Sequence, residues 1–189
     1  MTIAELQAMK RDGRKIAAVV CWDMNTASVA DAAGADIVSV GDSAADTLDE
    51  LLAFCASVRR GVARALVSCD VPEATLERAR RAVDLGADLV KVEGVGTVRE
   101  LARAGISVFA QIERADEARP MEEAGAVLID FRHSGAEEGV RAVAAVSIPV
   151  IGGLGGGPWL DGRVRAAHRL LDVESYLRDV RAARAVRGD

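Results

Sequence analysis

Residues 83–95 read VDLGADLVKVEGV, and the order of residue types in this stretch indicates how the chain folds. A helical segment ends at Gly86, a short run of mainly apolar residues follows at 88–92, and polar residues come next. Glycine suits the left-handed residue that ends many helices, and a short apolar run is typical of a strand buried in a parallel sheet. The stretch therefore predicts one helix-to-strand unit.

The same pattern recurs along the chain as DAAGADIVSVGDS from residue 31, ARAGISVFAQIE from 102 and EEAGAVLIDFRHS from 122. It predicts strands at 16–21, 36–41, 64–69, 88–92, 106–111, 126–131 and 148–152, with a weaker eighth at 163–168. Alternating helices and strands require a parallel sheet, and eight units favour a closed (β/α)8 TIM-type barrel in the α/β class. An open doubly wound sheet is the alternative.

The length of 189 residues fits one compact domain, 1–189, in which residues 1–12 form an N-terminal capping helix. Eight units share this length, so each has about 24 residues, which is close to the minimum for a strand, a helix and two turns. We therefore expect short loops between each strand and the helix that follows it.

Charge and composition exclude several classes of function. The formal net charge is −5, from 29 acidic and 24 basic residues, which argues against nucleic acid as a partner. The apolar stretches are too short to span a membrane, and the amino terminus reads as a capped amphipathic helix, so we expect a cytoplasmic protein. Three cysteines without CxxC spacing fit reduced thiols and indicate no zinc site.

Helix caps help to separate structural acids from chemical ones. Three capping-box patterns are predicted, at Thr47 with Glu50, Thr97 with Glu100 and Ser134 with Glu137. The polar residues upstream of these caps are then not needed for capping: Asp42, Ser43, Lys91, Glu93, Asp130 and Arg132. Asp70 ends a predicted strand but also begins a good cap sequence, Asp70-Val71-Pro72-Glu73, and both roles stay open.

Three carboxylates, Asp42, Asp70 and Glu93, follow three consecutive strands and are expected to converge at one end of the barrel. Such a cluster repels itself unless a cation fills it, and hard oxygen ligands favour Mg²⁺. The expected guest is a small 2-oxo acid that chelates the ion, whose enolate the ion would stabilise.

Lys91, one of only three lysines beside Lys10 and Lys15, lies two residues before Glu93 and so on the same face of its strand. We expect it to stabilise the enolate or aldol oxygen. The alternative is a satisfied internal ion pair.

The segment IGGLGGGP at 151–158 holds five glycines, and its backbone amides, at Gly153 and Gly155 among others, are candidates for binding the substrate's anionic group. A tight turn without a ligand is the alternative. His133 and His168 are isolated histidines that we expect to be surface or packing residues.

These motifs together resemble the ketopantoate hydroxymethyltransferase family. The matching stretches are TIAELQAMKRDGRKI, AGADIVSVGDS, ARALVSCDVP, GADLVKVEG and SIPVIGGLGGGPWLDGRV. The resemblance implies a barrel of the phosphoenolpyruvate mutase and isocitrate lyase type, with Asp42, Asp70 and Glu93 at the Mg²⁺ site and Ser43 and Lys91 at the substrate. It also implies hydroxymethyl transfer from methylenetetrahydrofolate to 3-methyl-2-oxobutanoate, in pantothenate biosynthesis, by a homo-oligomer.

The chain departs from the family where proton transfer is expected. Arg132 stands at the position of the family's catalytic glutamate, and Gln111 at that of a family histidine. Arginine does not act as a base at neutral pH, so Glu113, Asp130 or His133 would have to replace it. Arg132 would then be an anion clamp, which suits a redirected aldolase or lyase with a more highly charged substrate. A third hypothesis is a non-catalytic barrel that binds a ligand or a protein.

Overall fold

A computed structural model describes residues 1–132, 135–153 and 157–167. Eight parallel strands close into a barrel in the order β1 to β8, with β8 paired to β1, so the predicted (β/α)8 barrel is confirmed. The strands are β1 Ile16–Val20, β2 Ile37–Val40, β3 Leu66–Asp70, β4 Leu89–Val92, β5 Val108–Ile112, β6 Ala126–Phe131, β7 Val150–Gly152 and β8 Gly162–Ala166. Each overlaps a predicted strand, the weak eighth included.

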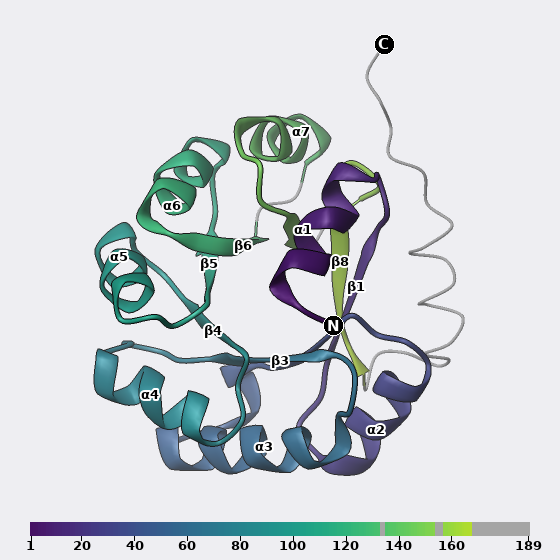
Figure 1. The fold of residues 1–189 in the computed structure, drawn as a ribbon, viewed down its shortest axis with the longest axis vertical. Helices are drawn as coiled ribbons and strands as arrows, with labels where there is room; N and C mark the ends of the chain where they lie inside the picture. The colour runs from purple at the N-terminus through teal and green to yellow at the C-terminus, as the bar shows by residue number, and fades with distance from the viewer. Residues whose placement is uncertain (133–134, 154–156, 168–189) are drawn as a thin grey trace.

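Helices surround the barrel, and α1 lies across one of its ends (Figure 1). The helices are α1 Ile3–Arg11, α2 Met24–Ala32, α3 Leu48–Gly61, α4 Leu76–Asp84, α5 Val95–Arg103, α6 Ala118–Ala124 and α7 Ala136–Ala145, with short 3-10 turns η1 Asp42–Ala44 and η2 Ala115–Glu117. Only two residues separate β4 from α5 and β5 from η2, as the predicted short loops require. In the described part of the chain, no helix is long and apolar enough to cross a membrane.

The barrel interior changes character along its axis. At the end where the strands begin, Leu6 and Met9 of α1 pack on Ile37, Leu66 and Leu89, the first interior residues of their strands. Because successive side chains of a strand point to opposite faces, β3 points Leu66, Ser68 and Asp70 inward in turn. The interior is therefore apolar at the end that α1 covers and polar at the carboxyl ends of the strands.

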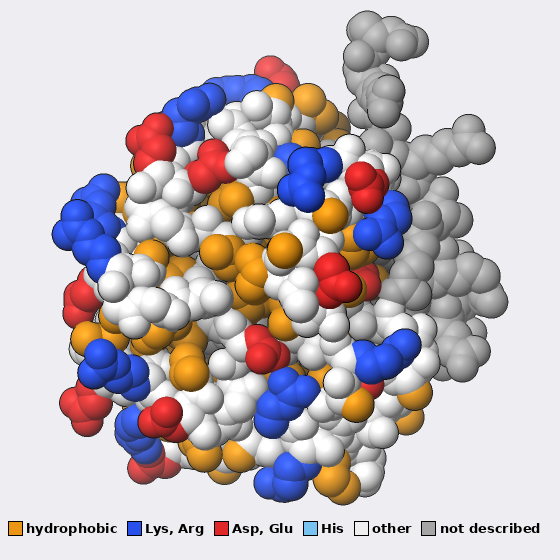
Figure 2. Space-filling model, in the orientation of Figure 1, with side chains coloured by type: hydrophobic (Ala, Val, Ile, Leu, Met, Phe, Trp, Pro, Cys, Tyr) orange, Lys and Arg blue, Asp and Glu red, His pale blue; other side chains and the backbone are white. Residues whose placement is uncertain are grey.

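Figure 2 shows the face that α1 covers, where acidic and basic side chains alternate around the rim without a continuous basic patch.

Two lysines connect α1 and the start of β1 to the last part of the described chain. Lys10 donates hydrogen bonds to the carbonyls of Val143 and Ile148, at 2.9 and 3.0 Å, and lies 3.1 Å from a carboxylate oxygen of Asp161. Lys15 donates to the carbonyls of Pro158 and Leu160 at 2.7 and 2.5 Å.

The structure confirms the predicted helix ends but only some of the predicted N-caps. Gly34, Gly86, Gly105 and Gly125 end helices with φ of 91, 104, 81 and 106°, as predicted. Thr47 accepts a hydrogen bond from the Glu50 amide, so its cap is confirmed. The Thr97 cap is wrong, because the N-cap of α5 is Gly94, three residues earlier, and the helix begins at Val95. Ser134 lies outside the described residues. Thr75 caps α4, which leaves Asp70 free of that role.

Asp31 of α2 fastens the segment between α3 and β3. Its carboxylate accepts hydrogen bonds from the backbone amides of Ala63, Arg64 and Ala65, at 3.1, 3.1 and 2.7 Å. Burial works to raise the pKa of this carboxyl, but these three bonds outweigh burial and lower it. The ionised form is thus the one that the fold stabilises.

We therefore expect Asp31→Asn to lower the free energy of unfolding at neutral pH by about 1–3 kcal/mol, because charged hydrogen bonds become weaker neutral ones. A carboxyl with a lowered pKa in the folded protein stabilises it above its ordinary pKa, and this contribution is lost as the pH falls. The difference from wild type should therefore shrink in acid. Urea unfolding at several pH values measures it, with the exposed Asp84→Asn as control. A difference that does not change with pH would contradict this account.

Candidate active site at the carboxyl ends of the strands

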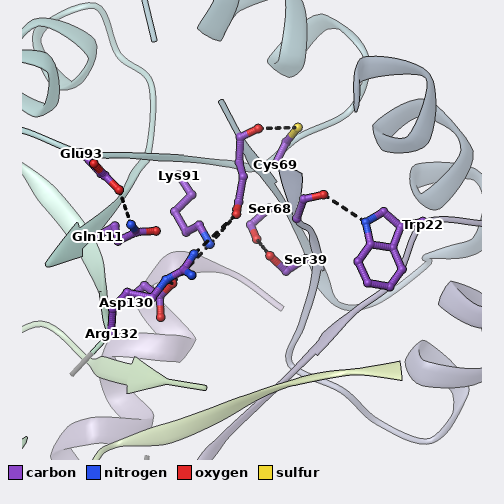
Figure 3. Close-up of polar contacts among 11 residues, drawn as sticks. Trp22, Ser39, Ser68, Cys69, Lys91, Glu93, Gln111, Asp130 and Arg132 are labelled. Carbon is purple, nitrogen blue, oxygen red and sulfur yellow. Dashed lines mark hydrogen bonds and ion pairs between the residues drawn. The ribbon is translucent and has the colours of Figure 1, made fainter. Parts of the chain in front are cut away.

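Lys91 stands at the polar end of the barrel interior, on β4 (Figure 3). The side chain is only 8% exposed, and its Nζ lies 2.6 Å from Oδ2 of Asp70 and 3.2 Å from Oδ2 of Asp130. Asp70 is the last residue of β3 and pairs with Lys91 in the sheet register, while Asp130 points inward from β6. The two buried carboxylates thus offset the cost of burying the positive charge of Lys91.

Arg132 completes this group directly after the end of β6. Its Nε donates to Oδ2 of Asp130 at 3.0 Å, and a terminal nitrogen lies 3.9 Å from Oδ2 of Asp70. In contrast to Lys91, the side chain is 38% exposed. We call Asp70, Lys91, Asp130 and Arg132 the mouth quartet; its formal charges, two positive and two negative, cancel.

The mouth quartet shifts the pKa values of its buried members. Burial raises the pKa of Asp70 to about 6, against the opposing effect of Lys91. Burial works to lower the pKa of Lys91, but the charges of Asp70 and Asp130 outweigh it and raise that pKa. At neutral pH both groups are therefore ionised.

One oxygen of Asp70 is left over. Lys91 and Arg132 both approach its Oδ2, whereas the buried Oδ1 has no hydrogen-bond partner among the described residues. Buried carboxylate oxygens are normally satisfied, and an exception calls for a functional or solvent partner. Oδ1 of Asp70 is thus an acceptor in the barrel mouth to which no described residue donates a hydrogen bond.

The three predicted metal ligands occupy different settings. Asp42 is exposed on η1, and its charge is among those that raise the pKa of Asp70. Glu93 is also exposed and accepts a hydrogen bond from Gln111. Within the described ranges, no group of three or more acidic, histidine or cysteine side chains is arranged to hold a metal ion. The ligand set of Asp42, Asp70 and Glu93 therefore stays a prediction.

Lys91 forms ion pairs with Asp70 and Asp130 and not with Glu93, which was expected on the same face of its strand. The internal ion pair considered as an alternative is present, with these different partners. The pattern did hold a signal for Asp130, since 126, 128 and 130 share the inward face of β6. A buried pair that the sequence did not reveal lies deeper in the barrel, where Ser68 Oγ donates to Ser39 Oγ at 2.7 Å.

The other predicted site residues are scattered. Ser43 is exposed on η1 next to Asp42, and the Gly153 carbonyl accepts a hydrogen bond from Arg165. Gly155, His133 and His168 lie outside the described residues. Glu113 is exposed and lines a cavity of about 560 Å³ with Glu93 and Gln111, which no member of the mouth quartet lines.

Several solved structures superpose on this barrel. A phosphoenolpyruvate phosphomutase from Streptomyces platensis subsp. rosaceus superposes with a TM-score of 0.68 at 16% identity, over 95% of this chain and 85% of that protein. A phosphonopyruvate hydrolase complexed with oxalate and Mg²⁺ gives 0.68 at 16% identity, over 96% and 85%. At this level of identity the similarity shows a shared barrel fold. The chain belongs to the ketopantoate hydroxymethyltransferase family, whose model matches residues 1–115.

Curated relatives agree with this family. A 3-methyl-2-oxobutanoate hydroxymethyltransferase from Cyanothece sp. is 36% identical over 213 residues, which cover 87% of this chain and 81% of the relative. One from Salinibacter ruber is 32% identical over 223 residues, covering 93% and 84%. Because 87% of 189 residues is about 164, roughly 49 of the 213 positions in the first alignment lie opposite gaps in this chain. The chain is thus a shortened enzyme of the hydroxymethyltransferase type.

Proposed function

We propose that this chain is a Mg²⁺-dependent enzyme that makes or breaks a carbon–carbon bond next to the carbonyl of a small 2-oxo acid, through an enolate. The relatives' name makes 3-methyl-2-oxobutanoate the first substrate to test. The family resemblance implies methylenetetrahydrofolate as the hydroxymethyl donor. The observation that carries the proposal is the buried Oδ1 of Asp70, which has no partner among the described residues and belongs to a carboxylate 2.6 Å from the ammonium of Lys91.

The residues present fit a Mg²⁺ ion. Oδ1 of Asp70 is a hard oxygen ligand that the described part of the protein does not use, and Mg²⁺ is typically held by one or two carboxylates together with water and substrate. Asp42, and Glu93 if it leaves Gln111, would complete the ligand set. When bound, the ion would supply Lewis-acid polarisation of the substrate carbonyl, which acidifies the adjacent C–H bond.

The chain itself supplies fixed charges. Asp70 and Asp130 hold the ammonium of Lys91 in place, so that it can stabilise negative charge on the substrate oxygen without first reorganising. Of the candidate bases, the structure favours Asp130 over Glu113. Asp130 contacts Lys91, whereas Glu113 makes no hydrogen bond or ion pair with a described residue of the mouth quartet. Gln111, engaged with Glu93, does not titrate and cannot take the proton.

Solvent exchange tests this proposal. In D2O with MgCl2, we expect the protein to exchange the C3 proton of 3-methyl-2-oxobutanoate, followed by NMR, and we expect EDTA to abolish the exchange. Addition of methylenetetrahydrofolate should then yield ketopantoate. Exchange without product would indicate a different carbon electrophile. The absence of both exchange and Mg²⁺ binding, in protein shown to be folded, would contradict the proposal.

A further inference from the structure

Arg132 lies beside both carboxylates of the mouth quartet, and a terminal nitrogen of its guanidinium is 3.9 Å from Oδ2 of Asp70 (Figure 3). Its Nε donates to Asp130 at 3.0 Å, and this is the one hydrogen bond that it makes among the described residues. Because a guanidinium carries five N–H groups, four remain for a ligand. The side chain is 38% exposed, so these donors can be reached from the barrel mouth.

Lys91 cannot take the same role. Its ammonium is 8% exposed and lies against both carboxylates of the mouth quartet, at 2.6 and 3.2 Å. Its positive charge is therefore balanced inside the barrel. Arg132 is thus the accessible cation of the quartet.

A fixed guanidinium has a defined chemical preference. It cannot act as a base, and its planar fork matches the paired oxygens of a carboxylate or of a phosphorus oxyanion. Anchoring of Nε by Asp130 orients the fork in advance and lowers the entropy lost on binding. A terminal nitrogen lies 3.9 Å from Oδ2 of Asp70, so the guanidinium is next to the place where the 2-oxo acid is proposed to bind.

We infer that Arg132 binds a second anionic group of the substrate, so that the preferred substrate is a 2-oxo acid carrying a further carboxylate or a phosphonate. This inference rests on the proposed function, because the 2-oxo acid end must bind at Asp70 and Lys91. It differs from the reaction named for the relatives, since 3-methyl-2-oxobutanoate has no second anion.

Calorimetry with matched pairs of acids, in the presence of Mg²⁺, tests the inference. The first pair is 2-oxopentanedioate against 2-oxopentanoate, and the second is 3-phosphonopyruvate against pyruvate. In one pair or both, we expect wild type to bind the doubly charged acid about tenfold more tightly, which corresponds to about 1.4 kcal/mol. The pair that shows the preference identifies the anion as carboxylate or phosphonate.

Variants then assign the preference to Arg132. Arg132→Gln should abolish this preference, so that the doubly and the singly charged acid of a pair bind with equal affinity. Arg132→Lys keeps the charge beside Asp130 but loses the fork, so it should retain only part of the preference and also serves if the glutamine variant does not fold. Arg81→Gln is the control, because Arg81 lies on α4 and pairs with Asp49.

Two outcomes would overturn the inference alone. One is equal affinity within both pairs for wild type, and the other is a preference that survives in Arg132→Gln. In either case, Mg²⁺-dependent binding of the singly charged acids would still support the proposed function. If no 2-oxo acid binds in a Mg²⁺-dependent manner, both the inference and the proposed function fail.

Discussion

Lys91→Met is expected to lower the free energy of unfolding by about 3–5 kcal/mol at neutral pH, because it leaves two buried carboxylates without their ammonium. Asp70 and Asp130 are 6% and 4% exposed, and Arg132, which remains, is only partly buried. Urea unfolding of the metal-free protein measures the loss. The variant should also lack C3 exchange activity, since no other described cation is buried at this position.

Making the same substitution in a second variant distinguishes the contribution of the Lys91 charge from that of its methylene groups. In the double variant Asp70→Asn/Asp130→Asn, the ammonium of Lys91 is buried without its carboxylates, so adding Lys91→Met should be neutral or stabilising. The sign of the effect thus reverses between the two backgrounds. A similar loss of stability in both would show that Lys91 contributes through its methylene groups and would contradict the ion-pair account.

Asp70→Asn is expected to reduce Mg²⁺-dependent C3 exchange by about three orders of magnitude, the scale seen when a main electrostatic contributor to a transition state is removed. The fold should survive, because Lys91 keeps Asp130 as its partner. Isothermal titration with Mg²⁺ should show weakened binding. Exposed Asp84→Asn is the matched control. Unchanged exchange in Asp70→Asn would remove this carboxylate from the proposed site.

The difference in free energy of unfolding between wild type and Asp70→Asn is expected to depend on pH. Burial raises the pKa of Asp70 to about 6, so the folded protein favours the protonated carboxyl. The stability that Asp70 contributes is therefore present in acid and lost as the pH rises through about 4 to 6. In EDTA, wild type should lose stability relative to Asp70→Asn over that range. The opposite slope would show that the ion pair with Lys91 outweighs burial.

The barrel could be predicted from sequence because its units repeat. Runs such as ADIVSV and GAVLIDF have enough β-branched and apolar residues to fix a strand, and the glycine before each fixes where the helix stops. Helix starts were harder to predict. Thr97 has the right residue three positions on, yet the tight turn after β4 lets α5 begin at Val95.

The candidate site was predictable in part. Asp70, Lys91 and Arg132 were correctly placed at the barrel mouth, but the partner of Lys91 was not. Alternation places Lys91 and Glu93 on one face only while the strand continues, and β4 ends at Val92. The scarcity of lysine did not distinguish Lys91 either, since Lys10 and Lys15 also bond internally. Pairing between strands distant in sequence, as for Asp130, requires the closed barrel.

The contacts of Lys10 bear on how this chain emerges from the ribosome. Helix α1, which covers the end of the barrel where the strands begin, is made before all eight strands. Its Lys10, however, donates to the carbonyls of Val143 and Ile148, which are 133 and 138 residues further along the chain. The first helix therefore waits for almost the whole described chain before it reaches its final position. Until β7 and β8 have been made, the apolar side chains of α1 lack part of the cluster in which they pack, which includes Ile151 and Val164. The unfinished chain therefore exposes apolar surface that favours aggregation.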